Sequence, residues 1–386
     1  MFKLITLMGL ILVEAFTAVM SGCSQESVLR LKVAVCRLDA TLGDVRAQCN
    51  LGHAYGNGEG VAQDKEAAVK WYRKAAERGY VKAQYNLGAS YHYGEGVAQD
   101  PKEGVKWFRR AAEQGFATAQ FGLGECYYHG QGIGQDDKEA IRWCRKAAEQ
   151  GYDKAQYNLA LRYYAGEGVG QDYKEAVKWF GKAACQGHVK AQYNLAFSYC
   201  NGIGVTQDYK EGEKWYRKAA EQGNAMARFN LGLMYYNGEG VAQDCKEAVK
   251  WFRDAVELDE ARAQYKLGVC YYRGEGVPQD HKEAARWFQL AAEQGRVAAQ
   301  HGLGVCYYRG EGVDQDYKEA IKWYRKAAEQ GDAKSQYNLG LMYYNGEGVA
   351  QDYREAARWL RSAADQGIED AKKVLKELGS ENVNNP

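Results

Sequence analysis

The cysteines and histidines are the residues of this chain best suited to chemistry, and their spacing argues against a metal site. The chain has ten cysteines and six histidines, but no C-x-x-C and no H-E-x-x-H motif, the spacings by which zinc is commonly bound. The histidines are scattered at His53, His92, His129, His188, His281 and His301. We expect no metal, no cofactor and surface histidines without a role. The alternative for His92 and His129 is that both face one groove.

Motifs for phosphate binding or nucleophilic catalysis are also missing. The segment GEGVGQ, at residues 166–171, superficially resembles a phosphate-binding loop. It lacks the preceding strand and the third glycine of such loops, and it recurs along the chain as a turn. The motifs S-x-x-K, S-D-N and K-T-G of β-lactam-recognising serine enzymes do not occur. We therefore predict that the protein is not an enzyme.

One pair of cysteines is a candidate for a disulfide bond. Cys126 and Cys144 lie 18 residues apart, on what we expect to be the two opposite helices of one structural unit. The alternative is that these cysteines, like the others, are small apolar side chains in packed positions.

The elements that position these residues form a strict internal repeat. Tryptophan recurs every 36 residues without exception, at Trp71, Trp107, Trp143, Trp179, Trp215, Trp251, Trp287, Trp323 and Trp359. A variant of one 36-residue sequence surrounds each tryptophan, with no insertion or deletion. The nine units occupy residues 47–82, 83–118, 119–154, 155–190, 191–226, 227–262, 263–298, 299–334 and 335–370. Such a repeat predicts a stack of identical supersecondary units.

Each unit is predicted to contain two helices. In the last unit the first helix ends at Gly346 and Gly348, and the second begins at Asp352, which we expect to be its N-cap. Glu355 follows three residues later, as in a reciprocal capping box, and Gly367 ends the second helix.

Two departures from this pattern and one recurring small residue are informative. The first unit has Asp64 followed by Ala67 instead of glutamate, and Asp259 replaces one turn glycine. A further position within the first helix is always Gly or Ala, at Gly52, Gly88, Gly124, Ala160, Ala196, Gly232, Gly268, Gly304 and Gly340. We expect two helix backbones to approach closely there, with tryptophan filling the space between stacked pairs.

The pattern A-Q-x-x-L-G-x-x-Y-x-x-G-x-G-V-x-Q-D-x-x-x-A-x-x-W-x-x-x-A-A resembles the Sel-1-like repeat, a relative of the tetratricopeptide repeat. The resemblance implies an all-α, right-handed α-solenoid of helix-turn-helix repeats. It also implies a role in binding other proteins. Some cysteine-rich relatives have been described as β-lactamase-like or as acting on cell-wall substrates; this chain lacks the motifs for that activity.

The two ends of the chain differ from the repeats. Residues 27–46 are predicted to form a degenerate capping helix, residues 371–379 a second cap, and residues 380–386 a disordered tail. Residues 1–22 combine Lys3 with a short apolar stretch, as in a secretory signal. The following Cys23 resembles the lipidated cysteine of bacterial lipoproteins. The alternative is an uncleaved helix on a cytoplasmic protein.

Two columns of aromatic residues mark the candidate binding face. The first is formed by Tyr85, Phe121, Tyr157, Tyr193, Phe229, Tyr265 and Tyr337, and the second by Tyr128, Tyr164, Tyr236, Tyr272, Tyr308 and Tyr344. Because they are seven residues apart, or two helical turns, both columns share one helix face. By analogy with tetratricopeptide repeats this face is a concave groove that binds an extended peptide or a helix. The alternative is that the tyrosines pack helix against helix.

Two further sets of residues belong to this face. An asparagine column pairs either with a bound peptide backbone or with its own helix, and comprises Asn50, Asn86, Asn158, Asn194, Asn230 and Asn338. Arg273 and Arg309 replace asparagine at neighbouring repeats and are candidates for holding an acidic segment. Sequence drift on a solvated face is the alternative. Glu125 and Arg162 occupy other positions near the groove.

Composition gives no general attraction to nucleic acid or to anionic membranes, because 51 basic and 50 acidic residues leave a net charge of +1. We expect a monomeric scaffold that binds protein or peptide partners and contacts a membrane only through a lipid anchor at Cys23. The predicted location is the periplasm or the outer membrane, as a lipoprotein. The alternatives are a secreted protein and a cytoplasmic regulatory scaffold.

Overall fold

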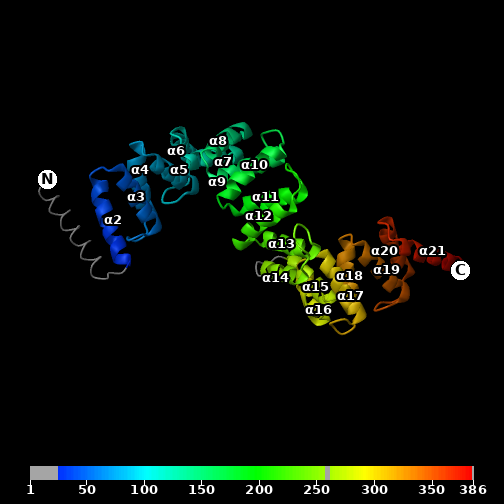
Figure 1. The fold of residues 1–386 in the computed structure, drawn as a ribbon. Coiled ribbons are helices and arrows are strands. Elements are labelled where there is room, and N and C mark those ends of the chain that lie inside the picture. Colours follow the sequence, from blue (N-terminus) through cyan, green and yellow to red (C-terminus); the bar gives the residue numbers. More distant parts are fainter. Residues whose placement is uncertain (1–24, 257–260, 385–386) are drawn as a thin grey trace. The chain divides into compact units, whose positions relative to one another are not determined.

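The computed structural model describes residues 25–256 and 261–384, and side chains as far as residue 378. The described residues are helical, with short turns and no strand, as the sequence predicted (Figure 1). None of the helices within these ranges is both long and apolar enough to cross a membrane. The predicted signal at residues 1–22, Cys23 and the atypical Asp259 lie outside the described residues.

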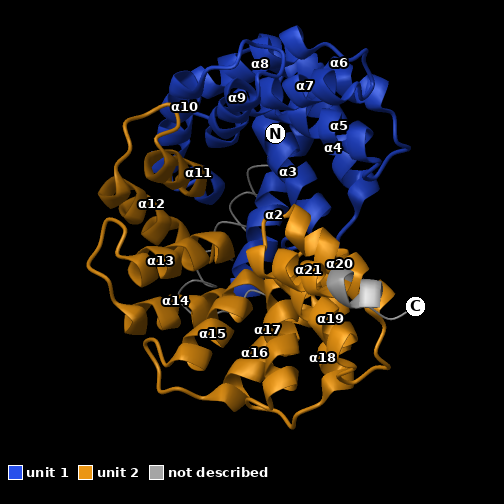
Figure 2. Ribbon diagram, turned by 90° about the vertical axis from the view of Figure 1, so that its right-hand side faces the viewer, with its two compact units in different colours: residues 1–191 blue, residues 192–386 orange. Residues whose placement is uncertain are grey.

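The chain divides into two compact units, residues 1–191 and 192–386, which we describe separately (Figure 2). The helices of the first unit are α2 (Gln25–Thr41), α3 (Val45–Asn57), α4 (Lys65–Glu77), α5 (Val81–Tyr93), α6 (Pro101–Glu113), α7 (Ala117–His129), α8 (Asp137–Glu149), α9 (Asp153–Ala165) and α10 (Tyr173–Cys185). Helix α11 (Val189–Asn201) crosses the boundary.

The second unit repeats the same alternation. Its helices are α12 (Tyr209–Glu221), α13 (Ala225–Asn237), α14 (Cys245–Val256), α15 (Ala261–Arg273), α16 (His281–Glu293), α17 (Val297–Arg309), α18 (Tyr317–Glu329), α19 (Ala333–Asn345), α20 (Tyr353–Asp365) and α21 (Glu369–Asn384). From α3 onward, odd-numbered helices are the first helix of a repeat, and even-numbered helices as far as α20 are the second. In the repeats that lie within one unit the two helices pair with each other, and in both units second helices pack against the next first helix.

Glycine and aspartate set the helix ends as expected. Gly58 ends α3 and Gly346 ends α19, both with φ near +74°, a conformation that costs glycine little. Asp136 caps α8, accepting hydrogen bonds from the backbone N–H groups of Lys138 and Glu139.

The reciprocal half of the predicted capping box is not formed at Asp100 and Glu103. The backbone N–H of Asp100 donates to the carbonyl of Tyr91, at 2.8 Å, so the glutamate is not needed there. Glu103 instead accepts from Lys106, one turn along the same helix. The first repeat therefore keeps its N-cap although Ala67 stands in place of glutamate, because the side chain of Asp64 still accepts from the Ala67 N–H.

The small residue in the first helix allows the close approach that we expected. A Cβ atom added to Gly88 would lie 3.1 Å from the carbonyl oxygen of Gly104 on the paired helix. Tryptophan then fills the gap to the preceding repeat, as predicted: Trp107 packs in a buried cluster with Tyr72 and Leu87.

A buried glutamine links three helices at successive joints. Gln120 donates to the carbonyl of Ala112 on the preceding helix, at 3.1 Å, and accepts from Gln150 at the end of the following one, at 2.7 Å. In the sixth repeat Arg228 stands in this place, and its guanidinium reaches the carbonyls of Ala220 and Asp254. The recurrence of A-Q in most repeats thus has a structural cause.

The C-terminal helix is longer than predicted. We expected a cap over residues 371–379 followed by a disordered tail, but α21 continues to Asn384. The first residue that cannot continue a helix is Pro386. Ala371 and Leu378 belong to the buried cluster that closes the last repeat.

Candidate binding groove

The two aromatic columns lie on the first helices of the repeats. We call Tyr85, Phe121, Tyr157, Tyr193, Phe229, Tyr265 and Tyr337 the upstream column, and Tyr128, Tyr164, Tyr236, Tyr272, Tyr308 and Tyr344 the downstream column. Of these side chains only Phe229 is buried; the others are half-buried. They therefore present part of each ring to solvent and part to the protein.

The upstream column packs within its own repeat. The ring of Tyr85 lies 5.6 Å from that of Phe108, and Tyr193 lies at the same distance from Tyr216. Phe229 makes the equivalent contact with Phe252. The packing alternative is thus observed for these rings, which leaves only the exposed part of each half-buried ring for a ligand.

The downstream column is held by hydrogen bonds to the next repeat. The hydroxyl of Tyr272 donates to the carboxylate of Glu311, at 2.5 Å, and Tyr236 donates in the same way to Glu275. Burial, together with the bond to Glu275, raises the pKa of Tyr236 to about 12, so this hydroxyl stays protonated. These bonds fix the ring orientation along the first helices.

A tyrosine column that the sequence analysis did not single out has a purely structural role. These residues directly precede the downstream column, and Tyr127 is an example: its hydroxyl accepts from Arg109 of the preceding repeat, at 2.8 Å. Tyr235 accepts from Arg217 in the same way. The 18-residue spacing of arginine and tyrosine recurs along the sequence and is the signal that would have revealed it.

The asparagine column contacts neighbouring repeats instead of its own helix turn. The amide of Asn158 donates to Glu125, at 3.3 Å, and that of Asn86 to the sulfur of Cys49. Asn230 forms a side-chain hydrogen bond with Tyr216. A bound peptide would therefore compete with these internal partners.

Arg273 and Arg309 are exposed and lie beside carboxylates. Each guanidinium is 3.8 Å from a glutamate two residues further on, Glu275 and Glu311 respectively. Arg309 also donates to the hydroxyl of Tyr272. These arginines partly neutralise the glutamates that hold the downstream column.

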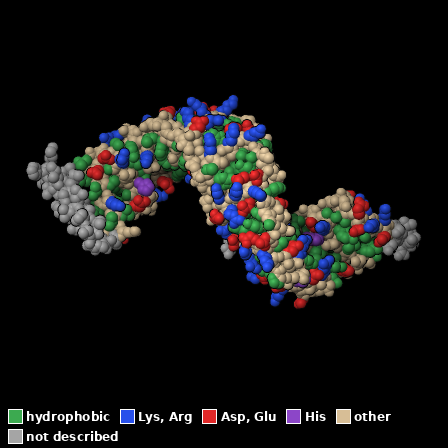
Figure 3. All heavy atoms as spheres, viewed as in Figure 1, with side chains coloured by type: hydrophobic (Ala, Val, Ile, Leu, Met, Phe, Trp, Pro, Cys, Tyr) green, Lys and Arg blue, Asp and Glu red, His purple; other side chains and the backbone are tan. Residues whose placement is uncertain are grey.

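Charges of opposite sign border the columns. Basic residues begin the first helices, at Lys82, Lys154, Lys190, Arg262 and Lys334, and acidic residues follow them in the loop, at Glu95, Glu167, Glu239, Glu275, Glu311 and Glu347. A 13-residue helix separates the two sets by about 20 Å. Basic and acidic side chains are also mixed on the face drawn in Figure 3, so no field of one sign dominates that face.

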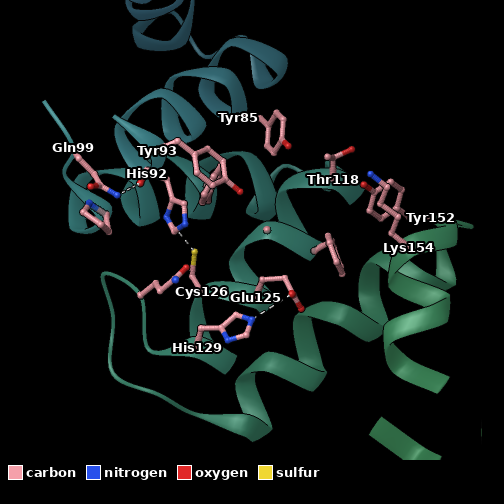
Figure 4. A pocket seen from close by; sticks show the side chains of 15 residues that line it. Tyr85, His92, Tyr93, Gln99, Thr118, Glu125, Cys126, His129, Tyr152 and Lys154 are labelled. Atoms are coloured by element: carbon pink, nitrogen blue, oxygen red, sulfur yellow. Dashed lines mark hydrogen bonds and ion pairs between the residues drawn. The ribbon is translucent and has the colours of Figure 1, made fainter. Parts of the chain in front are cut away.

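A hollow of about 610 Å³ in the first unit lies on α5 and α7, with the start of α9 (Figure 4). Its wall includes the rings of Tyr85, Tyr93 and Phe121, together with Glu125 and Lys154. A second hollow of about 380 Å³ lies over Tyr157 and Asn158. In the second unit a smaller one, of about 140 Å³, is lined by Tyr308, Arg309 and Asn338.

Two histidines differ from the expected surface residues. His92, at a downstream-column position, is buried, and its ring nitrogen Nδ1 lies 3.9 Å from the sulfur of Cys126. His129 is exposed and lies 3.7 Å from Glu125. Both line the hollow of Figure 4, so the alternative in which they share one groove describes them better.

The candidate disulfide is not formed. Cys126 and Cys144 are both free and buried, and the thiol of Cys144 donates to the carbonyl of Ala155, at 3.3 Å. Burial raises the pKa of each thiol to about 12. They behave as packed small side chains, and a thiolate nucleophile is disfavoured at both positions. Within the described ranges no three His, Cys, Asp or Glu side chains are grouped to hold a metal ion.

A family model described as the Sel1 repeat matches nine segments of this chain. The segments are residues 45–80, 81–116, 117–152, 153–188, 189–224, 225–260, 261–295, 297–332 and 333–368. The chain belongs to the Sel1 repeat family. The matched Sel1 repeats start two residues before the units that we delimited from the sequence, and the first of them starts with helix α3.

Two solved structures are similar over most of the chain. One is c5321, a protective antigen of uropathogenic Escherichia coli strains that displays an SLR fold. It is 40% identical, with a TM-score of 0.86 over 91% of this chain and 75% of that one. The other is a Sel1 repeat protein from Oxalobacter formigenes, 34% identical, with a TM-score of 0.60 over 85% of this chain and 93% of that one. No curated protein matches the chain.

Membership of the family indicates the broad class of function. Sel1 repeat proteins are generally scaffolds for protein interaction, in agreement with the role expected from the sequence. The α-solenoid of helix pairs is likewise the fold of these relatives.

Proposed function

We propose that this protein is a non-enzymatic scaffold that holds a segment of a partner polypeptide against the aromatic columns of its first helices. The observation that supports this most directly is the series of half-buried rings beside hollows of about 610 and 380 Å³ in the first unit. Tyrosine offers a large contact area with little loss of rotamer freedom, and a hydroxyl for polar contacts.

The downstream column provides the test. Replacing Tyr236 and Tyr272 together by alanine removes two rings that a partner would contact. We expect capture of native partners by the immobilised protein to fall at least tenfold, while the helical circular dichroism signal stays. The double Phe variant is the control, because it keeps both rings and loses only the hydroxyl bonds to Glu275, Glu311 and Arg309. If the double alanine variant loses partner capture only in proportion to its loss of stability, the proposal is contradicted and these rings serve packing.

We propose further that the scaffold acts in the cell envelope, exported by residues 1–22 and anchored through a lipid on Cys23. The support is the sequence of this segment alone. Mass spectrometry of the N-terminus after cell fractionation tests it: a lipidated Cys23 in the membrane fraction is expected. An intact Met1 in the cytosol would instead establish the alternative of a cytoplasmic scaffold.

Absence of catalysis is part of the same proposal. A fluorescent penicillin at saturating concentration should leave the folded protein unlabelled. Covalent labelling that is blocked by unlabelled penicillin would overturn this point.

A further inference from the structure

Two positions of the repeat distinguish the hollow of Figure 4 from most of the groove. Six of the nine repeats have asparagine where the third has Gly122. A Cβ atom added to Gly122 would come no closer than 4.0 Å to the rings of Tyr85 and Phe108. The missing side chain therefore leaves this part of the groove open.

The second difference is a carboxylate in an otherwise apolar column. The equivalents of Glu125 in seven other repeats are apolar, namely Ala89, Leu161, Phe197, Leu233, Val269, Val305 and Leu341. Among the described residues, Glu125 is the one carboxylate that lines the hollow. Its side chain is 34% exposed, so its charge is screened less than that of a fully solvated group.

Among the described residues, the contacts of Glu125 include no ion pair with a lysine or arginine. They come from the amide of Asn158, which is neutral, and from the imidazole of His129, which is charged only when protonated. Lys154, the permanent cation of the wall, is exposed, and Figure 4 draws it beside Thr118 and Tyr152, away from His92. Water screens an exposed ammonium strongly, so Lys154 does not cancel the field of Glu125 inside the hollow.

Aromatic rings supply much of the remaining wall, together with polar side chains such as Gln99, Thr118 and Gln131. Tyr85 and Phe108 are 5.6 Å apart, Phe121 meets the edge of Tyr152 at 5.4 Å, and Tyr93 is 69% exposed at the mouth. Ring faces attract cations through their quadrupole, and a nearby carboxylate adds charge-assisted hydrogen bonds. The volume of about 610 Å³ is in the range of ligand pockets.

We propose that this hollow is a specificity pocket for a basic side chain, arginine or lysine, of the partner polypeptide. The inference rests on the proposed function and specifies the partner: the polypeptide that lies along the first unit carries a basic residue, which Glu125 pairs and the aromatic walls enclose. Repeats that have an apolar residue instead of Glu125 provide contact area without this selection.

The experiment selects peptides from a library of random dodecamers displayed on phage, using four folded proteins. These are the unchanged chain, Glu125→Gln, Gly122→Asn and Glu149→Gln. Gly122→Asn installs the residue that most repeats carry, so the variant is expected to fold while the asparagine fills the hollow. Glu149→Gln is the control, because it makes the same charge change at an exposed position outside the pocket lining.

The unchanged chain and Glu149→Gln should enrich peptides with an arginine or lysine at one fixed position, and the other two variants should not. Exchanging that arginine for neutral citrulline in a selected peptide should weaken binding to the unchanged chain about tenfold and leave binding to Glu125→Gln nearly the same. Peptides that bind without a basic position, or that bind Glu125→Gln with the same basic preference, would overturn the inference alone. Selection of no peptide by any folded protein would overturn both the inference and the peptide-binding function on which it rests.

Discussion

At the scale of single residues, each helix joint depends on side chains that reach a neighbouring helix. The glutamine of the A-Q pair is the clearest case, because Gln120 is 5% exposed and bonds to both adjoining second helices. Where this glutamine is replaced, Arg228 makes two backbone contacts of the same kind. These exchanges show that the joint requires a donor and not glutamine itself.

Removing this donor should destabilise the first unit measurably. Gln120→Ala removes one hydrogen bond that the Ala112 carbonyl accepts and one that the Gln150 amide donates, and should lower the free energy of unfolding by about 1–3 kcal/mol. Urea denaturation followed by circular dichroism measures it. The control Gln150→Ala changes an exposed residue and removes only one of the two bonds, so a loss as large as that of Gln120→Ala would contradict the argument.

His301 should make the second unit sensitive to acid. Its Nδ1 lies 2.9 Å from the hydroxyl of Ser335 and 3.4 Å from Asp332, beside the ring of Tyr324. Burial lowers the pKa of His301, with Asp332 opposing and Lys334 reinforcing this shift. The unfolded chain therefore takes up the proton near the ordinary pKa of about 6.5, and the folded chain only at lower pH. The contribution of the neutral ring to stability is complete above that pH and is lost as the pH falls through the folded pKa.

The measurement compares urea midpoints at pH 7.5 and pH 5 for the unchanged chain and for His301→Tyr, which restores the residue of neighbouring repeats. We expect the midpoint of the variant to fall less over this range. Replacing the exposed His53 by asparagine should leave the pH dependence unchanged. Equal pH dependence in all three proteins would show that His301 does not titrate differently on folding.

At the scale of the helix, the aspartate and the glutamate of the D-x-x-E motif contribute unequally to the helix N-terminus. The D-x-x-E pattern resembles a capping box, yet Asp100 alone bonds the helix N-terminus, and Glu103 pairs with Lys106 on the surface. The N–H that the glutamate would have bonded is taken by a carbonyl of the preceding helix. The turn between the two helices thus replaces one half of the motif.

This difference predicts the result of two substitutions. Asp100→Ala should lower the free energy of unfolding by about 1 kcal/mol, as is usual for a lost N-cap. Glu103→Ala should cost less, about 0.5 kcal/mol, because it removes only an exposed ion pair and a favourable charge in the first turn. Thermal unfolding monitored by circular dichroism would test this order. The reverse order would support the reciprocal capping box that the sequence predicted.

At the scale of the whole molecule, stability within each unit arises from contacts between helices adjacent in sequence. Solenoids of this kind are stabilised by each repeat and by its interface with the next. The proposed binding surface follows from the same arrangement, because the first helix of every repeat after the first adds an aromatic ring to one or both columns. A partner is then recognised by the few positions at which repeats differ.

Removing one full repeat should therefore preserve the fold. Deleting residues 117–152 joins Phe116 to Asp153, which Tyr152 precedes in the unchanged chain, so the helix boundary is kept. We expect an unchanged helical signal per residue and a lower unfolding temperature. Deleting only residues 117–134 leaves a second helix without its first and should abolish cooperative unfolding; retention of a sharp transition by this half-repeat variant would contradict the prediction.

The sequence by itself determined the helix pairs, their caps and glycine turns, and the columns that mark one face. An unbroken 36-residue period fixes where the caps, the turn glycines and the apolar positions fall, and each of these acts on the backbone within a few residues. The tertiary structure alone decided which tyrosines pack and which border a hollow, that Cys126 and Cys144 are unpaired, and that α21 continues to Asn384.

The tertiary structure decides these features because the hydrogen-bond partners of the side chains come from neighbouring repeats. Tyr272 is oriented by Glu311 and Asn158 by Glu125, which lie 39 and 33 residues away on neighbouring repeats. The hollow beside Glu125 exists because Gly122 removes a side chain at a place that two other helices border. The periodic sequence shows that Gly122 and Glu125 differ from the equivalent residues of most repeats. Only the packing across repeats decides whether such a difference opens a hollow.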